Sequence, residues 1–370
     1  MKICIYIPTA SFFVGGGETV PLTQARYLAD IGYNVRVAVL RVNRESDYFQ
    51  DFKTKYPYIE YDYLESPIPD IENNNLDHKL GQLLYLKLNS QAYEYFKMQN
   101  FNLVLTHYSA AAISVPNSIP QILYLHGVPE NSEPQSRAAC EIAGRLVAVS
   151  QSVADGWKKL ISPDLDITVI RNGIDENVFK PDPDITKDID ILYIGRLIEI
   201  KGVQFLIQAV KTLTTQTEYA QVRVEISGDG PYKAKLQELV SELHLESQVH
   251  LGGYIVNSLL PNLYHRSHLA VFPSYAKEGV LTTLLEAAAS GCCLISSDCC
   301  GMKEFIVDDQ NGLLFPPQNS GRLAQCLRRA FSDSLLQNRL GMAARQEVLK
   351  NWTWNKSISK LDQLIKQFSV

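Results

Sequence analysis

No apolar run in this chain of 370 residues reaches the ~18 residues that a membrane-spanning helix needs. The opening residues, MKICIYIPTA, carry one Lys and a short apolar run, but the run stops at Pro8, lacks a small-residue cleavage site and alternates like a strand. No long basic tract is present, and the net charge of −5 disfavours a nucleic-acid-binding protein. We therefore expect a cytoplasmic protein, and a peripheral association with the inner face of a membrane is compatible with this.

Disulfides and a zinc site are also disfavoured. The seven cysteines are an odd number in a chain without an evident export signal, which favours free buried thiols. Two Cys-Cys pairs occur, at 292–293 and 299–300. Adjacent residues of a strand point to opposite faces, so neither pair can chelate a metal as a unit.

Short apolar runs alternate with helical patterns along the whole chain, which is typical of βαβ units and parallel sheets. With 46% hydrophobic and 20% charged residues the chain is globular, and it is too long for one ordinary core. The predicted strands are KICIYIP, NVRVAVL, IEYDYL, LVLTHY, QILYLHG, RLVAVS, ITVIRNG, IDILYIG, VRVEISGDG, VHLGGY, LAVFPS, CLISSD and NGLLFPP. Helices are predicted between them, notably over 201–215, 231–244, 258–266, 282–290 and 320–350.

An Asp- and Pro-rich stretch at 175–190, DENVFKPDPDITKDID, is interpreted as a linker between two halves of similar size. The sequence therefore predicts an α/β protein with two Rossmann-like doubly wound domains facing a cleft. We assign residues 1–178 to the first domain and 184–351 to the second, and expect a helix at about 352–370 to pack back on the first. In such sheets ligands bind at the carboxyl ends of the strands.

The second half contains a carboxylate within an otherwise apolar predicted helix. The stretch from Val280 to Ser290 is apolar or small all round a helix, yet Glu286 lies within it and Glu278 stands eight residues earlier. A buried carboxylate requires hydrogen-bond donors. We expect Thr282 or Thr283 to cap this helix. The N-terminus of the helix would suit a bound diphosphate. A carboxylate such as Glu286 would suit the two adjacent hydroxyl groups of a ribose.

Two further stretches could bind phosphate. GRLIEIKG, at 195–202, follows the first strand of the second half and carries Arg196 and Lys201, which we expect to be partly solvated. A glycine run, VGGGETV at 14–20, precedes the first helix and would let backbone amides approach an anion. The run lacks the Gly-x-Gly-x-x-Gly spacing of a dinucleotide site, and strand two ends without an acidic residue.

These motifs occur in a specific order. The E-x7-E pattern in EGVLTTLLE, together with GRLIEIKG, ISGDGP, VIRNGIDENVF, NGLLFPP and the N-terminal GGGE, resembles the retaining glycosyltransferases with the GT-B fold of family 4, or group 1. That family makes bacterial polysaccharides and glycolipids. The resemblance extends over nearly the whole chain and rests on several motifs rather than on one.

The resemblance implies roles for individual residues. Glu286 would bind the ribose of a nucleotide sugar, Glu278 the hydroxyls of the donor sugar, and Arg196 and Lys201 its diphosphate. His126, in LYLHG, would lie near the transferred sugar, and with Glu278, Arg196 and Lys201 it forms the predicted catalytic set. Further donor-binding residues implied by the resemblance are Gly15, Gly16 and Gly17 over the diphosphate, Gly253, Tyr254 and Ile255 at the base, and Gly228, Gly279, Val280, Leu281 and Thr282.

The implied reaction moves a hexose-type sugar from a UDP-linked donor, with retention, to a glycan or lipid-linked acceptor in exopolysaccharide or glycolipid synthesis. No Asp-x-Asp metal motif lies at a comparable site, so neither a metal nor a cofactor is expected. The acceptor site is expected in the first domain, where 53–100 is rich in Tyr, Asn and Leu. A sugar-nucleotide epimerase of the same architecture and a non-catalytic nucleotide-sugar-binding protein remain alternatives.

Overall fold

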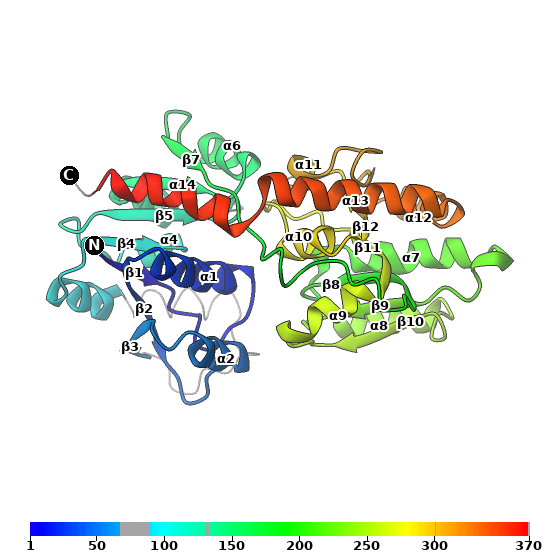
Figure 1. Ribbon diagram of the computed structural model, residues 1–370, viewed down its shortest axis with the longest axis horizontal. Coiled ribbons are helices and arrows are strands. Elements are labelled where there is room, and N and C mark those ends of the chain that lie inside the picture. The colour runs from blue at the N-terminus through cyan, green and yellow to red at the C-terminus, as the bar shows by residue number, and fades with distance from the viewer. Residues whose placement is uncertain (67–88, 130–133, 300, 369–370) are drawn as a thin grey trace. The chain divides into compact units, whose positions relative to one another are not determined.

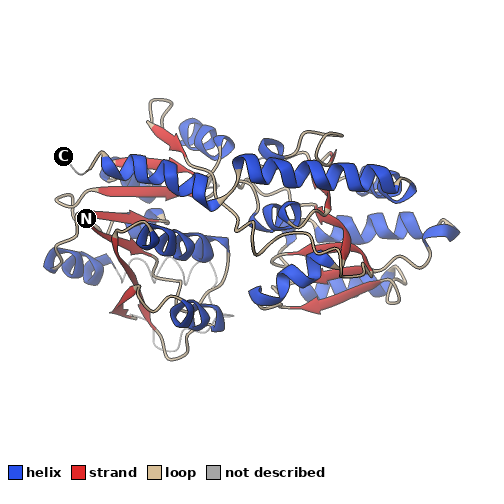
Figure 2. Cartoon of the chain, viewed as in Figure 1, coloured by secondary structure: helices blue, strands red, loops and turns tan. Residues whose placement is uncertain are grey.

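The computed structural model describes residues 1–66, 89–129, 134–299 and 301–368. The chain forms two compact units, one made of Met1–Asn172 and Trp354–Val370 and the other of Gly173–Thr353. Each unit holds a parallel sheet with helices between successive strands (Figures 1 and 2). The predicted α/β class with two Rossmann-like units is therefore confirmed.

The sheet of the first unit has the strand order β3-β2-β1-β4-β5-β6-β7. Its strands are β1 (Lys2–Tyr6), β2 (Asn34–Arg41), β3 (Glu60–Glu65), β4 (Leu103–Thr106), β5 (Gln121–Leu125), β6 (Arg145–Ala148) and β7 (Ile167–Val169). Its helices are α1 (Gly16–Asp30), α2 (Asp47–Lys55), α4 (Ser109–Ala112), α5 (Pro134–Ile142), α6 (Gln151–Leu160) and α14 (Trp354–Lys366), and residues 89–98 are helical as well. Chain order reverses between β1 and β4, which makes their carboxyl ends the expected ligand edge.

The sheet of the second unit repeats this order as β10-β9-β8-β11-β12-β13. Its strands are β8 (Ile189–Ile194), β9 (Val224–Ser227), β10 (Val249–Gly253), β11 (Ser267–Phe272), β12 (Cys293–Ser297) and β13 (Leu313–Phe315). Its α-helices are α7 (Val203–Thr214), α8 (Lys233–Glu242), α9 (Leu260–His265), α10 (Thr282–Ala289), α11 (Met302–Phe305), α12 (Ser320–Ser332) and α13 (Ser334–Asn351), with 3-10 turns η1 (Glu199–Lys201), η2 (Thr217–Tyr219) and η3 (Asn257–Leu259). In this sheet the chain order reverses between β8 and β11, and this reversal is called the switch point below.

Strand alternation creates a core on each face of both sheets. In β1, Ile3 and Ile5 pack into one buried cluster, whereas Cys4 and Tyr6 pack into the opposite one. All strand neighbours in both sheets are parallel, and fully buried parallel strands read as continuous apolar runs. This is why fully buried strands such as β4 and β5 could be found from short apolar runs.

The predicted helix over 320–350 is wrong in one respect, because the structure divides it into α12 and α13 at Asp333. Asp333 has an extended backbone, and its side chain accepts a hydrogen bond from the amide of Leu336, so it caps α13. Buried residues recur every three or four positions within each helix, but Ala330 and Leu336, on either side of the break, are six positions apart. The predicted helix at 258–266 begins as the turn η3 before α9.

The first unit ends at Asn172, earlier than the predicted residue 178. Ile174 pairs with Thr353 and is buried in the same cluster of the second unit as Trp352. The terminal helix α14 belongs to the first unit, beside α1 (Figure 1). Tyr33 anchors α14 by donating to Asp362 at 2.7 Å.

None of the helices in the described ranges is long and apolar enough to cross a membrane.

Shortening one core side chain of α14 should destabilise the first unit. Leu361 is fully buried in the same cluster as Ile3, so Leu361→Ala should lower the free energy of unfolding by about 2–5 kcal/mol. Hydrogen exchange of the β1 and β2 amides in urea measures this. Lys360→Ala, at an exposed neighbouring position, should change it by no more than about 0.5 kcal/mol. Equal exchange in both variants would show that α14 does not stabilise this sheet.

Candidate functional site

The strand order of the second unit collects the predicted residues at one edge of its sheet. Arg196 and Lys201 follow β8, and Glu278 follows β11, the neighbouring strand at the switch point. Gly228 follows β9, and the 253–255 turn ends β10. Because all four strands are parallel, their carboxyl ends lie at the same edge, where doubly wound sheets bind ligands.

Lys201 and Glu278 form an ion pair at this edge. The ammonium Nζ of Lys201 lies 2.7 Å from both carboxylate oxygens of Glu278. Ser274 donates to Oε1 of Glu278 at 2.9 Å as well. Lys201 is only 8% exposed, so the prediction that it is partly solvated is wrong. The sequence could not show this, because the partner lies 77 positions away.

Arg196 differs from Lys201 in its surroundings. The residue is exposed, and within the described ranges its guanidinium has no hydrogen-bond or ion-pair partner. Its carbonyl accepts a hydrogen bond from the hydroxyl of Tyr193 at 3.1 Å, which holds the backbone at the end of β8. Arg196 therefore offers a free planar donor group at the ligand edge.

The donor to Glu286 is Tyr264, on α9. Its hydroxyl lies 2.8 Å from Oε2 of Glu286, and Tyr264 itself is 1% exposed. Burial raises the pKa of the Glu286 carboxyl to about 7, and the hydrogen bond from Tyr264 lowers it. The second oxygen, Oε1, has no partner among the described residues, and Glu286 is partly exposed. One oxygen is thus fixed and the other is available to a ligand.

Helix α10 begins without a side-chain cap. Leu281 is the N-cap residue, and its carbonyl accepts from the amides of Leu284 and Leu285. Thr282 is already the first helical residue, so the expectation that Thr282 or Thr283 caps the helix is wrong. The amides of Thr282 and Thr283 precede the first intrahelical bond and form the positive end of the helix.

The loops after β8, β9 and β10 are joined by backbone hydrogen bonds. The amide of Gly228 donates to the carbonyl of Gly253 at 2.7 Å. Gly228 has φ +151°, and a Cβ there would lie 1.9 Å from the carbonyl oxygen of Gly195. Only glycine fits this approach. Of the predicted base-binding residues beyond Gly253, Tyr254 is 55% exposed and Ile255 packs against the core.

In the first unit the glycine run is the start of a helix rather than a loop. Gly15 is the N-cap of α1, and Gly16 and Gly17 lie within it. Glu18 is buried and accepts from the hydroxyls of Thr9 and Tyr108. A Cβ on Gly17 would lie 2.4 Å from the Tyr108 hydroxyl oxygen, so this helix end is held closely against the carboxyl end of β4.

His126 directly follows β5, as predicted from LYLHG, and is partly exposed. Its Nε2 lies 2.8 Å from Nδ1 of His107, which directly follows the neighbouring strand β4. Burial lowers the pKa of His126 to about 4, and burial together with His126 lowers the pKa of His107 well below its ordinary value. Both rings are therefore neutral near pH 7.

The structure places the predicted residues after β8, β9, β10 and β11 at one edge of the second sheet, whereas Gly15, Gly16, Gly17 and His126 belong to the first unit. Sequence reasoning missed four supporting residues, which are Ser274, Tyr264, His107 and Tyr108. His107 and Tyr108 are the last two residues of the predicted strand LVLTHY, and this position at its carboxyl end could have suggested them. Tyr264 gave no signal, because its pairing with Glu286 depends on the packing of α9 against α10.

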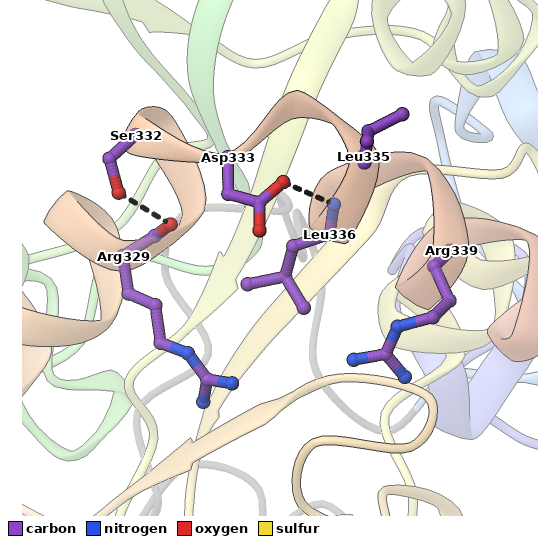
Figure 3. Close-up of a pocket in the computed structure, with 6 residues that line it drawn as sticks. All are labelled: Arg329, Ser332, Asp333, Leu335, Leu336 and Arg339. Carbon is purple, nitrogen blue, oxygen red and sulfur yellow. Dashed lines mark hydrogen bonds between the residues drawn. The ribbon is translucent and has the colours of Figure 1, made fainter.

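Other polar features of the second unit do not belong to this edge. Cys292 and Cys293 pack into different clusters, Cys300 lies outside the described residues, and the described ranges hold no group of three His, Cys, Asp or Glu placed to bind a metal. A pocket lies at the junction between α12 and α13, and none of the predicted site residues lines it (Figure 3). Its two arginines, Arg329 and Arg339, both bind Asp309.

Known proteins share this architecture. The structure superposes on sucrose-phosphate synthase from Thermosynechococcus elongatus with a TM-score of 0.83 at 20% identity, covering 99% of this chain and 98% of that one. It superposes on Anabaena Alr3699/HepE, solved in complex with UDP-glucose, with a TM-score of 0.77 at 20% identity, covering 99% and 100%. The two units thus form a GT-B fold.

The family follows from the sequence matches. Residues 14–178 match the Glycosyltransferase Family 4 description, and residues 175–347 match Glycosyl transferases group 1. The chain therefore belongs to the family 4/group 1 glycosyltransferases. Glycogen synthase of Mycobacterium tuberculosis is 31% identical over 212 residues, which is 56% of this chain. The match spans 50% of the length of that relative.

Lys201 and Arg196 should differ in how much they contribute to the free energy of unfolding. Lys201→Ala leaves the Glu278 carboxylate without its cation, a change that costs about 3–5 kcal/mol for a fully buried pair. Because Glu278 is partly exposed, we expect about 1–3 kcal/mol, measured by urea unfolding. Arg196→Ala is the matched control and should stay within about 0.5 kcal/mol of wild type. Glu278→Gln should recover part of the loss in the Lys201→Ala background, and additive effects would argue against the pair.

Proposed function

We propose that this protein is a retaining, metal-independent glycosyltransferase. It moves a hexose-type sugar from a UDP-sugar to a glycan or lipid-linked acceptor in polysaccharide or glycolipid synthesis. The observation that carries the proposal is the carboxylate of Glu286, whose Oε2 accepts from Tyr264 while Oε1 has no partner among the described residues, on the helix that begins at the ligand edge. A ribose presents two adjacent hydroxyl donors, which suit such an acceptor.

Charge at the same edge suits a leaving diphosphate. Negative charge grows on the diphosphate as the sugar departs, and groups that bind this charge lower the barrier. Arg196 offers a free guanidinium, and the amides of Thr282 and Thr283 offer a positive helix end. Lys201 follows the same strand as Arg196, and its ammonium group donates to Glu278. These groups supply the stabilisation that a divalent ion gives in other transferases, which supports metal independence.

Retention of configuration is supported by the bonds that Glu278 makes. A double displacement would need an unencumbered carboxylate nucleophile below the anomeric carbon. Both oxygens of Glu278 accept from Lys201, and Oε1 accepts from Ser274 too, which reduces its nucleophilicity. A same-face transfer, in which the leaving phosphate takes the acceptor proton, fits this arrangement better. Glu278 would then bind donor-sugar hydroxyls.

Two observations support a UDP-linked donor. One is the set of groups at the carboxyl edge of the second sheet, and the other is a structural neighbour. Anabaena Alr3699/HepE was solved with UDP-glucose. The predicted acceptor segment, 53–100, lies partly outside the described residues. We propose a cytoplasmic location, compatible with a lipid-linked acceptor at the inner face of a membrane.

Replacing Glu286 should weaken donor binding. Glu286→Gln keeps the shape but loses a charge-assisted acceptor, and hydrogen bonds to charged groups contribute about 1.5–3 kcal/mol. We expect the Kd of UDP-glucose in calorimetric titration to rise about 10- to 100-fold. Glu242→Gln, at an exposed position of α8, should bind like wild type. An unchanged affinity in Glu286→Gln would mean that this carboxylate serves packing alone.

The same titration should depend on pH. Because burial raises the pKa of Glu286 to about 7, the ionised form that accepts from ribose becomes populated as the pH rises from 6 to 8. The affinity of wild type for UDP-glucose should therefore increase over this window and level off above it. The Glu286→Gln variant should show no such rise.

The reaction itself is tested with radiolabelled UDP-sugars, with and without candidate acceptors. Transfer should survive excess EDTA, and an α-linked donor should give an α-linked product by the anomeric proton signal. Arg196→Ala should lower kcat at least tenfold while its thermal melt stays near that of wild type. A β-linked product from an α-linked donor would refute retention, and loss of activity in EDTA would refute metal independence.

A further inference from the structure

The contact between His107 and His126 restricts where their protons can lie. His107 is 2% exposed and stacks on Tyr124, with ring centroids 4.8 Å apart and planes 15° from parallel. Its Nδ1 faces Nε2 of His126 at 2.8 Å, and its own Nε2 is buried with no partner among the described residues. His126 is partly exposed, and its remaining nitrogen, Nδ1, has no partner in the described part of the chain.

Each neutral ring carries one proton, and the short contact can hold one of the two. In one arrangement His126 donates from Nε2, so the proton of His107 must sit on its buried Nε2, where no acceptor is present. In the other arrangement His107 donates from Nδ1, and only a bare lone pair is left at its Nε2. Orphaned buried N–H groups are rarer than acceptors that lack a donor, so the second arrangement is favoured.

We propose that His107 is a positioning residue, which donates from Nδ1 to Nε2 of His126 and thereby fixes His126 as the tautomer protonated on Nδ1. The contact at 2.8 Å, the burial of His107 and the partnerless Nε2 carry this inference. The neighbouring strands β4 and β5 end directly before the two histidines, which sets their separation. His107 does not itself reach solvent.

The consequence for the reaction rests on the proposed function. His126 would present an N–H donor, and not an acceptor, to an oxygen of the donor sugar. Because the ring stays neutral, it would donate without adding positive charge beside a sugar that becomes oxocarbenium-like in the transition state. The wrong tautomer would place a lone pair where the sugar oxygen needs a donor.

Ring nitrogens of selectively ¹⁵N-labelled histidine test the tautomer directly, with His126→Gln used to assign the signals. In wild type, Nδ1 of both His126 and His107 should show shifts of protonated nitrogens and both Nε2 atoms those of bare nitrogens, unchanged from pH 6 to 8. A protonated Nε2 on His126 would overturn the proposal. This readout does not need catalysis, so failure to transfer sugar would refute the proposed function alone.

Variants test the positioning role. His107→Leu removes the donor, and the His126 signals should shift towards protonated Nε2, with kcat for UDP-glucose falling about tenfold or more and KM changing little. His107→Asn keeps an N–H donor near the Nδ1 position and should restore the tautomer and most of kcat. Tyr124→Phe keeps the stacked ring and controls for packing. Unchanged His126 signals in His107→Leu would contradict the role of His107.

Discussion

The ion pair between Lys201 and Glu278 holds together the two loops on which the candidate site depends. Lys201 ends a turn after β8 and Glu278 lies in the loop after β11, so the pair bridges the switch point of the second sheet. Ser274 adds a hydrogen bond to the same carboxylate. Removing water from both charges is unfavourable unless they stay paired. The pairing therefore fixes the loop that leads into α10, and the free amides at the start of this helix lie at the ligand edge. Arg196 remains outside this pair as an exposed cation.

In each unit a buried side chain fixes one atom of a partly exposed functional side chain. In the second unit, a buried tyrosine fixes one oxygen of Glu286 and leaves the other for a ligand. In the first unit, a buried histidine, His107, fixes one nitrogen of His126 and leaves the other exposed. In both cases a residue without solvent access orients a functional group that has it. Such support holds a partly exposed functional group in one orientation.

Most of the fold could be predicted from the sequence, since fully buried parallel strands appear as separate apolar runs. The break at Asp333 was not predicted, because it is marked only by the capping side chain of Asp333 and by a shift in the phase of the buried residues. Among the site residues, motif order indicated Glu278 and Glu286, but their partners lie far away in sequence. The burial of Lys201 and the donor Tyr264 depend on how loops and helices meet, which local patterns do not contain.

The central claim is that Glu286 is the ribose acceptor of a nucleotide-sugar site built on the carboxyl edge of the second sheet. A crystal structure of the full chain with UDP tests it most directly. The account predicts ribose hydroxyl oxygens within about 3 Å of Glu286 Oε1, with Tyr264 still donating to Oε2 and the diphosphate at the start of α10. UDP bound elsewhere, or with its ribose away from Glu286, would contradict the account.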